Sequence, residues 1–530
     1  MGSVNKRFEE SFRRHWALPA LSNYQGATLS YGQAAERIEL LQLALRKAGL
    51  GKGDRVAICG KNQANWPVAY LSALTAGYVP VALLHEFHPD SISHLLQHSG
   101  AKAFFADEAI FGKVRTGCLT FNLKDFTLLQ GPEGFMDEVA AEFTEKYPFG
   151  FSASNLDYFE DSPEDLAMIN YTSGTSGFSK GVMLPYRSIE VNIDGAAVTA
   201  EPQMKAGDNV VAILPCAHMY GLMFETLFEL SIGAHVHYLT RMPSPRIVME
   251  AFKDIKPDLI ISVPLIMEKV YKSKMKNVLG KYGRFLDMSL VGGIMRRYIK
   301  GSLTKAFGER FEEVILGGAA LNPEVEEFLR GIRFRFTCGY GMTECGPLIT
   351  YEKWKKTRRG SCGKPIPGVK VRIDSPDPLG IPGEVQVGGK GVFLGYYNNP
   401  EATADAFTED GWLRTGDMGV LDKDGYLYLR GRCKCMLLGA NGQNIYPEEL
   451  EATINTFDEV VDSLVVEDAG ALVALIYPDA RKASEQDVLD LLPRINAALP
   501  PYAHVRRIEV MKQDFERTPK KSIKRYLYQK

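Results

Sequence analysis

The sequence predicts an α/β protein with mainly parallel sheets, followed by a small antiparallel β element and a compact C-terminal α/β unit. From residue 55 to about residue 340, short apolar segments alternate with amphipathic helical ones, the pattern of parallel α/β layering. After Pro347, glycine and proline become dense and the apolar runs take hairpin-like spacing. Residues 435–530 then show an apolar periodicity of their own, as a separate domain requires. A chain of 530 residues also exceeds what one hydrophobic core supports.

The elements of the α/β region follow from apolar runs bounded by polar or turn-forming residues. Strands are predicted at residues 55–59, 79–83, 101–105, 166–170, 210–214, 235–239, 259–263 and 313–316. Helices are predicted at residues 66–75, 90–98, 186–198, 222–230 and 323–330. Ligands of parallel sheets bind where loops leave the carboxyl ends of strands, which makes the loop after residues 166–170 a candidate site.

The β-rich region and the C-terminal unit are predicted to contain different secondary structure. In the β-rich region, residues 377–383 are predicted to form a turn. In the C-terminal unit, helices are predicted at residues 448–456 and 485–498, and strands at residues 460–466, 471–477 and 505–510.

The composition is that of an ordinary globular protein. Hydrophobic residues make up 45% and charged residues 24% of the chain, and the formal net charge of −2 offers no general attraction to nucleic acid or anionic lipid. The apolar run 259–267 is far shorter than a membrane span, and the N-terminus has no hydrophobic signal core. Eight cysteines without disulfide-like spacing predict reduced thiols and a cytoplasmic protein.

The candidate loop, residues 171–181, reads YTSGTSGFSKG and combines glycines, hydroxyl side chains and Lys180. Glycines let backbone N–H groups approach an anion, hydroxyls donate to phosphate oxygens, and lysine adds positive charge. The spacing is not that of a Walker A loop. A flexible polar linker is the alternative, but it explains neither the preceding apolar strand nor the lysine. The loop therefore predicts a phosphate site.

Further motifs extend this prediction to a nucleotide. In GYGMTE, residues 339–344, the ring of Tyr340 suits stacking on a base, Thr343 suits a phosphate, and Glu344 suits Mg²⁺. In GWLRTGDMG, residues 411–419, the carboxylate of Asp417 suits ribose hydroxyls. Residues 431–451 combine basic residues with a glycine turn before a helix, and residues 516–527 form a basic C-terminal loop.

With these motifs in this order, the chain resembles the adenylate-forming (AMP-binding) superfamily over about residues 20–527. Within it, the chain most resembles the long-chain fatty acyl-CoA synthetases, because residues 442–451 are similar to the corresponding segment of those enzymes. The resemblance implies an N-terminal domain over residues 1–431, with two parallel-sheet α/β subdomains to about residue 345 and a β-barrel-like part over about residues 346–431. It further implies a hinge at residues 432–434 and a small mobile α+β lid at residues 435–530.

The resemblance also implies a two-step reaction with ATP, Mg²⁺ and CoA. A carboxylate attacks the α-phosphate of ATP to give an acyl-adenylate and pyrophosphate, and after the small domain rotates, a thiol, usually that of CoA, displaces AMP. The expected acid is a medium- or long-chain fatty acid. Nucleic acid and a transmembrane segment are not expected, peripheral contact with a membrane is compatible with the sequence, and the oligomeric state is left open.

Individual residues match the family motifs. The phosphate loop is matched by Thr172, Ser173, Gly174, Thr175, Gly177 and Lys180. The adenine and acyl pocket is matched by Gly317, Gly318, Ala319, Tyr340 and Gly341. Thr343 matches the phosphate-contacting hydroxyl, Glu344 the Mg²⁺ ligand and catalytic carboxylate, and His218 the gate beside the acyl carboxylate. Asp417 and Arg432 match the ribose-binding pair, Lys434 the hinge, and Gly442 the glycine that the pantetheine thiol passes.

One departure from the family concerns the C-terminal loop. The family lysine that bridges the acyl carboxylate and the α-phosphate aligns here with Ser522, which carries no charge to stabilise the developing anion. Lys520 and Lys524 each lie two residues away, on the same side of an extended loop, so we expect one of them to act as the catalytic cation. The alternative is a slow first half-reaction.

Two other functions stay open. One is an aryl- or amino-acid adenylating enzyme that loads a carrier protein, and the other is a nucleotide-binding regulator that has lost the chemistry. Met219, Met223 and Phe224 suit an adaptable apolar acyl tunnel, but they fit an ordinary core equally well.

Overall fold

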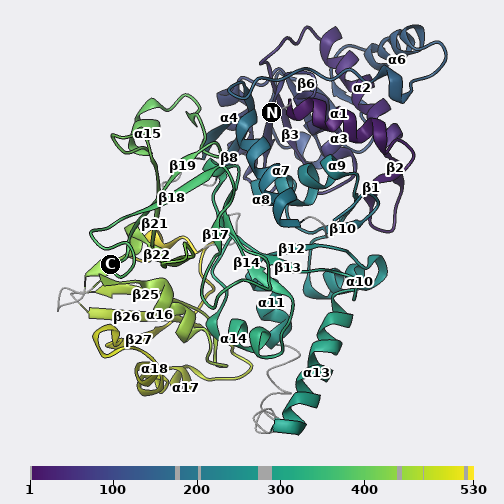
Figure 1. Ribbon diagram of the computed structural model, residues 1–530. Helices are drawn as coiled ribbons and strands as arrows, with labels where there is room; N and C mark the ends of the chain where they lie inside the picture. The colour runs from purple at the N-terminus through teal and green to yellow at the C-terminus, as the bar shows by residue number, and fades with distance from the viewer. Residues whose placement is uncertain are drawn as a thin grey trace.

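The computed structural model describes residues 3–172, 179–200, 204–272, 289–438, 444–468, 471–517 and 523–529. Figure 1 shows an upper part formed mainly by the N-terminal half of the chain and a lower part that contains the C-terminal elements. Among the described helices, none has the length and apolar character needed to span a bilayer.

The first layer is an eight-stranded sheet with the order β20-β9-β8-β4-β3-β5-β6-β7. Its five central strands are parallel: β8 (Leu166–Thr172), β4 (Val79–Leu83), β3 (Arg55–Cys59), β5 (Ala103–Ala106) and β6 (Leu119–Asn122). Antiparallel pairs complete both edges, through β7 (Leu128–Gln130), β9 (Lys180–Pro185) and β20 (Gly395–Tyr396). Apart from Arg55 at the start of β3, strands β3, β4 and β5 are continuously apolar, as expected for a sheet covered on both faces.

The second layer places strands from distant parts of the chain side by side. Its four-stranded sheet has the order β10-β11-β1-β2, with β10 (Asn209–Ala212), β11 (His235–Tyr238), β1 (Pro19–Asn23) and β2 (Thr28–Ser30). A parallel bridge between Val210 and Leu259 connects β10 to the parallel three-stranded sheet of β12 (Ile260–Ser262), β13 (Val314–Leu316) and β14 (Phe336–Cys338). Two largely parallel layers therefore form the α/β part, which confirms the predicted fold class.

Most helices of the α/β part lie around these sheets, whereas the helix Ser289–Ala306 extends away from them below the helix Pro245–Ile255 (Figure 1). The helices of this part are α1 (Val4–Arg14), α2 (Tyr31–Lys47), α3 (Asn65–Leu74), α4 (Pro89–Ser99), α5 (Glu108–Phe111), α6 (Phe135–Lys146), α7 (Tyr186–Ala200), α8 (Met219–Leu222), α9 (Phe228–Ile232), α10 (Pro245–Ile255), α11 (Pro264–Val270), α13 (Ser289–Ala306) and α14 (Pro323–Gly331). Side-chain caps define where some of these helices begin. A capping box of Ser30 and Gln33 begins α2, and Ser244 caps the N-terminus of α10.

The β-rich part is antiparallel, as predicted. One sheet has the order β18-β19-β21-β22, formed by β18 (Val369–Asp374), β19 (Gly383–Gly389), β21 (Leu413–Leu421) and β22 (Leu427–Arg432). A smaller one contains β15 (Tyr340–Gly341), β16 (Leu348–Tyr351) and β17 (Lys364–Pro365), and α15 (Pro400–Asp405) follows β20. The predicted turn at residues 377–383 lies between β18 and β19.

The C-terminal region has a core of its own. It contains the pair β23 (Leu437–Leu438) and β24 (Asn444–Ile445), helices α16 (Pro447–Ile454), α17 (Glu485–Leu489) and α18 (Leu492–Ala498), and the sheet of β25 (Val460–Asp468), β26 (Ala471–Pro478) and β27 (Arg507–Val510). Two hydrophobic clusters on the two faces of this sheet are separate from the large cluster that extends from Val4 to Leu427.

Three predicted elements differ from the structure. The helix expected at 485–498 is two helices, and Pro493, which lacks a backbone N–H, accounts for the break before α18. The helix expected at 222–230 begins at Met219 and contains a π-helical turn, Met223–Leu227, which residue spacing does not reveal. The loop after β8 connects two antiparallel strands, so the phosphate-loop motif closes a hairpin.

Candidate active site

The phosphate-loop motif is held at both ends by paired strands. Thr172, the last residue of β8, lies directly opposite Lys180, the first residue of β9, so their side chains share one face of the sheet. The intervening residues Ser173, Gly174, Thr175 and Gly177 lie outside the described residues. Tyr171 is buried and its hydroxyl contacts Nδ1 of His98 at 2.6 Å, which leaves Thr172 as the hydroxyl at the entrance of the loop.

Lys180 and Glu344 both contact the side chain of Tyr396. Lys180 Nζ lies 4.6 Å from the centre of the Tyr396 ring, and the Tyr396 hydroxyl donates a hydrogen bond of 2.9 Å to Oε1 of Glu344. Glu344 and Thr343 belong to a short 3₁₀ turn after β15, and both are largely buried. The structure thus brings together a cation and a carboxylate that sequence reasoning assigned separately, and it adds Tyr396, which sequence reasoning missed.

Asp417 is the centre of a second polar cluster. Its Oδ2 accepts a 2.6 Å hydrogen bond from the Tyr340 hydroxyl, and its Oδ1 lies 2.9 Å from Nε of Arg432, its partner across the β21–β22 pair. Burial raises the pKa of the Asp417 carboxyl, while Arg432 and the Tyr340 hydroxyl act in the opposite direction. Burial, with the nearby Asp417 charge, raises the pKa of Tyr340, which keeps its hydroxyl a donor.

Gly341 shows how tightly the segment between these two clusters is packed. A Cβ atom built on Gly341 would lie 2.0 Å from the carbonyl oxygen of Pro347, so only glycine fits there. Tyr340 and Glu344 are only four positions apart, and the negative charge of Glu344 is one of the contributions that raise the pKa of Asp417. One rigid segment therefore holds the two clusters in a fixed relation.

A third group of predicted residues meets around Tyr220. His218 caps the start of α8, where its Nδ1 accepts a hydrogen bond from Tyr220 N at 3.3 Å. The Tyr220 hydroxyl donates to the carbonyl of Ile315, and its ring fills the space beside Gly317, where a Cβ would approach it to 2.9 Å. Gly318 and Ala319 are exposed just beyond β13. Tyr220 is a second residue that sequence reasoning missed.

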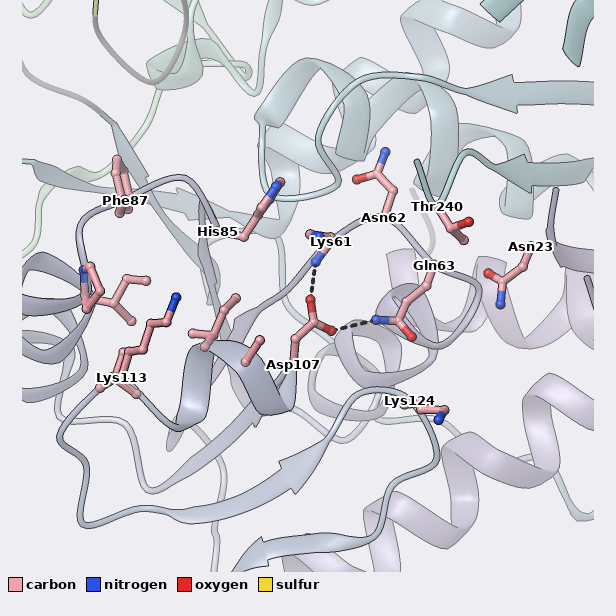
Figure 2. A pocket seen from close by; sticks show the side chains of 15 residues that line it. Asn23, Lys61, Asn62, Gln63, His85, Phe87, Asp107, Lys113, Lys124 and Thr240 are labelled. Atoms are coloured by element: carbon pink, nitrogen blue, oxygen red, sulfur yellow. Dashed lines mark hydrogen bonds between the residues drawn. The ribbon is translucent and has the colours of Figure 1, made fainter. Parts of the chain in front are cut away.

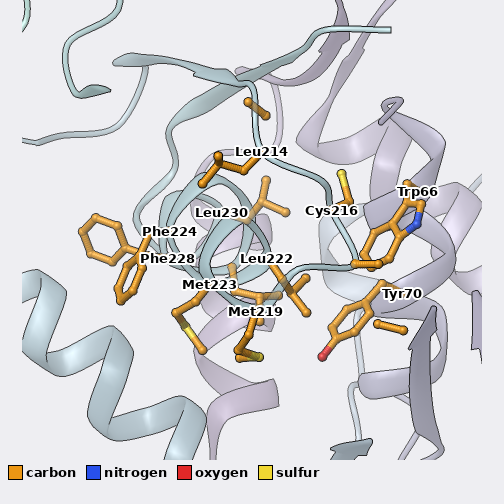
Figure 3. Close-up of a cluster of buried hydrophobic side chains, with 14 of the residues drawn as sticks. Trp66, Tyr70, Leu214, Cys216, Met219, Leu222, Met223, Phe224, Phe228 and Leu230 are labelled. Atoms are coloured by element: carbon orange, nitrogen blue, oxygen red, sulfur yellow. The ribbon is translucent and has the colours of Figure 1, made fainter. Parts of the chain in front are cut away.

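The apolar residues after His218 are buried. Met219, Met223 and Phe224 lie in a cluster of buried hydrophobic side chains that also contains Trp66 and Tyr70 (Figure 3). They pack against the rest of the large hydrophobic core, which agrees with the interpretation as core residues and leaves the acyl tunnel a prediction.

The hinge and the C-terminal loop are described only in part. Lys434 lies in a 3₁₀ turn, Cys433–Cys435, directly after β22, whereas Gly442 is outside the described residues. Lys520 and Ser522 are also outside them, in the segment enclosed by the antiparallel bridge between Arg517 and Ile523. Lys524 pairs with Glu516 of its own loop, Nζ to Oε2, at 3.2 Å. In this conformation its charge is directed at that carboxylate.

Metal ligands are sparse in the part of the chain that the structure describes. No group of three or more His, Cys, Asp or Glu side chains is placed there to hold an ion. Glu344 nevertheless suits Mg²⁺, because the Tyr396 hydroxyl donates to Oε1 and no described residue donates a hydrogen bond to Oε2. Mg²⁺ commonly takes one or two carboxylates and completes its shell with substrate phosphates and water.

A cavity of about 680 Å³ lies at the carboxyl ends of β3, β5 and β6 (Figure 2). Lys61, Lys113 and Lys124 line it, and their ammonium groups form no ion pair or hydrogen bond within the described residues. The one acidic lining residue, Asp107, is already occupied, since it accepts hydrogen bonds from the backbone N–H of Lys61 at 2.8 Å and from Gln63 at 2.9 Å. Sequence reasoning missed these lysines, although Lys61 follows a predicted strand end.

Comparison with known proteins places the chain in a family. The family model described as "AMP-binding enzyme" matches residues 8–397. The chain is 29% identical to a long-chain-fatty-acid–CoA ligase of Yersinia pestis over 493 residues, which covers 88% of this chain and 82% of that ligase. It is 27% identical to the long-chain-fatty-acid–CoA ligase FadD15 of Mycobacterium tuberculosis, over 86% of this chain and 78% of that protein.

Solved structures agree with this assignment. The ATP-bound MatB of Rhodopseudomonas palustris superposes with a TM-score of 0.77 at 25% identity, covering 99% of this chain and 98% of that one. The o-succinylbenzoate CoA synthetase MenE of Bacillus subtilis, solved with an acyl-adenylate, has the same fold, with a TM-score of 0.78 at 20% identity over 100% of this chain and 98% of that one. The predicted resemblance to adenylate-forming enzymes is confirmed, and the chain belongs to the family of AMP-binding enzymes.

Proposed function

We propose that the protein is an AMP-forming acid–thiol ligase that converts a carboxylic acid to an acyl-adenylate and then to a CoA thioester. The observation that carries the proposal is that one segment, residues 340–344, connects the polar cluster around Asp417 with the cluster of Tyr396 and Lys180. Tyr340 reaches Asp417 at one end of that segment, and Glu344 reaches Tyr396 and Lys180 at the other. A nucleotide needs this separation, with a pocket for base and ribose on one side and a cation with a metal-binding carboxylate on the other.

The nucleoside end would lie against the Asp417 cluster. Asp417 would accept hydrogen bonds from the ribose hydroxyls while Arg432 holds the carboxylate in place. Because the hydroxyl of Tyr340 is bonded to Asp417, its ring is fixed in orientation and suits stacking on the adenine. The strip at Gly317, Gly318 and Ala319 would complete this pocket.

The phosphates would lie against Lys180. Lys180, with Thr172 and the loop residues 173–177, would neutralise the departing pyrophosphate, and Thr343 would donate to a phosphate oxygen. Bound Mg²⁺ would supply charge neutralisation between the phosphates, with the free oxygen of Glu344 as its protein ligand. His218 would lie beside the acyl carboxylate.

The division at residues 432–434 suits the second step of such a reaction. The C-terminal core is separate from the large core. Polar contacts between the two parts include Asn322 Nδ2 to the carbonyl of Ala452 at 3.2 Å, Lys272 Nζ to the carbonyl of Asn455 at 3.0 Å, and the ion pair of Arg430 with Glu449. We propose residues 1–431 as the adenylation domain, Lys434 as the pivot, and residues 435–530 as a lid that brings Gly442 to the thioester site.

The acid is proposed to be a medium- or long-chain fatty acid. Relatives that cover most of the chain are named long-chain-fatty-acid–CoA ligases. Solved structures of the same fold include a benzoate CoA ligase of Burkholderia xenovorans, so an aryl acid is the second candidate.

The unpaired lysines of the 680 Å³ cavity suit the phosphates of CoA, and its apolar wall at Phe87 and Ile92 suits an uncharged portion of CoA. We also propose a cytoplasmic location, with which the eight free cysteine thiols are compatible.

Pyrophosphate release tests the proposal directly. The purified chain would be incubated with ATP and Mg²⁺ and a series of acids from acetate to palmitate together with benzoates, with and without CoA. The expected result is acid-dependent release of pyrophosphate and a CoA thioester that peaks for one class of acid. Adenylate without any CoA thioester would refute the ligase and favour a carrier-protein-loading enzyme, whereas ATP binding without pyrophosphate release would favour the regulator.

A further inference from the structure

Tyr396 occupies its position because of strand pairing. On β20, Tyr396 is opposite Val182 of β9, and Lys180 lies two residues before Val182 on the same strand. Side chains two positions apart share a face of a strand, and diagonal neighbours across a pair are within reach of an aromatic ring. The register therefore directs the ring of Tyr396 to Lys180, where the ring centre lies 4.6 Å from Nζ. At this separation the ring face attracts the ammonium group.

The hydroxyl at the other end of the ring is equally constrained. It donates to Oε1 of Glu344 at 2.9 Å, and the backbone carbonyl of Glu344 accepts from Phe393 N at 2.9 Å. The ring of Phe393 packs edge-on against Tyr396, with centres 4.9 Å apart, and Tyr396 N donates to Thr403 Oγ1. Backbone and side chain are thus both fixed.

We propose that Tyr396 is a positioning residue that sets the spacing between the pyrophosphate-binding cation Lys180 and the metal-binding carboxylate Glu344. By occupying Oε1, it leaves Oε2 of Glu344 available to a metal–nucleotide complex. This inference deepens the proposed function and rests on it, because the roles of Lys180 and Glu344 are those proposed above.

Two substitutions separate the two contacts. Tyr396→Phe removes only the hydroxyl, so the bond to Glu344 is lost and the ring over Lys180 remains. Tyr396→Leu removes both. The matched control is Tyr397→Phe, because Tyr397 follows β20 directly and its ring packs edge-on against His98, with ring centres 5.7 Å apart. Folding of each variant would be verified by circular dichroism.

The readout is ATP binding by calorimetry with Mg²⁺ and with EDTA, with no turnover required. A lost hydrogen bond to a charged group predicts about tenfold weaker binding of Mg–ATP by Tyr396→Phe, with metal-free ATP unaffected. Tyr396→Leu is expected to weaken binding under both conditions, and Tyr397→Phe under neither. Equal weakening by Tyr396→Phe with and without Mg²⁺, or no change at all, would overturn the inference. Failure of the wild-type protein to bind ATP under either condition would instead refute the proposed function.

Discussion

Replacing Asp417 with asparagine tests the nucleoside pocket with little change of shape. The Asp417 carboxylate accepts from Tyr340 at 2.6 Å and lies 2.9 Å from Arg432, and its side chain is only 14% exposed. Asparagine keeps one acceptor oxygen and replaces the other with an NH₂ group, so one of these donors and at least one ribose hydroxyl lose their acceptor. A lost hydrogen bond to a charged group corresponds to about 1.5–3 kcal/mol, which is about a ten- to hundredfold weaker binding of ATP.

The assay is calorimetric titration with ATP at several pH values. Since burial raises the pKa of Asp417, its carboxylate takes up a proton at a higher pH than an ordinary aspartate, and wild-type ATP affinity should fall on acidification from that higher pH. Asp417→Asn should be weaker at neutral pH and should lack this acid limb. The control is Asp374→Asn at the exposed last position of β18, which should bind ATP as the wild type does. A folded Asp417→Asn protein with wild-type affinity would refute the proposed role.

Three further predictions concern charged side chains. Glu229 is fully buried, neither of its carboxylate oxygens has a hydrogen-bond partner among the described residues, and burial raises its pKa. The free energy of unfolding should therefore fall as pH rises above the unfolded pKa of about 4.5. Scanning calorimetry should show that Glu229→Gln raises Tm more at pH 8 than at pH 5. If Lys520 or Lys524 supplies the adenylation cation, alanine at that position should slow pyrophosphate release about a hundredfold while preformed acyl-adenylate still reacts with CoA, and two fully active alanine variants would exclude both. Lys113→Glu should raise KM for CoA about three- to tenfold and leave KM for ATP unchanged, and an unaltered KM for CoA would separate the cavity from CoA binding.

The sequence predicted most clearly those features that depend on local chemistry. The central strands β3 and β4 have the predicted bounds, because a strand buried on both faces is a continuous apolar run. The motif around Tyr340 and Glu344 was found because its residues are within five positions of each other. The resemblance assigned Asp417 to the ribose and Tyr340 to the base, but the hydrogen bond between them, across 77 positions, was not predicted.

Features that depend on long-range pairing were not predicted. Strand β1, near the N-terminus, inserts beside β11, with Leu21 opposite Val236, and nothing in the periodicity of either segment specifies the other as its partner. The lysines of the 680 Å³ cavity come from three separate loops, so their common location depends on the order of β3, β5 and β6 in the sheet. Local spacing contains no information about that order.

For Tyr396, the information that the sequence lacks is the partner strand of β20 and the register of that pair. Tyr396 and Tyr397 are adjacent in the sequence, but no strand was predicted there, and β20 ends at Tyr396. What the sequence does not give is the partner strand and its register, and once Tyr396 is opposite Val182, contact with Lys180 follows from geometry. A slip of one residue would turn Tyr397 to this face and remove the hydroxyl from Glu344. The register of β20 against β9 is therefore a determinant of the site, and changes that disturb it should weaken metal–nucleotide binding even where no residue of the site is altered.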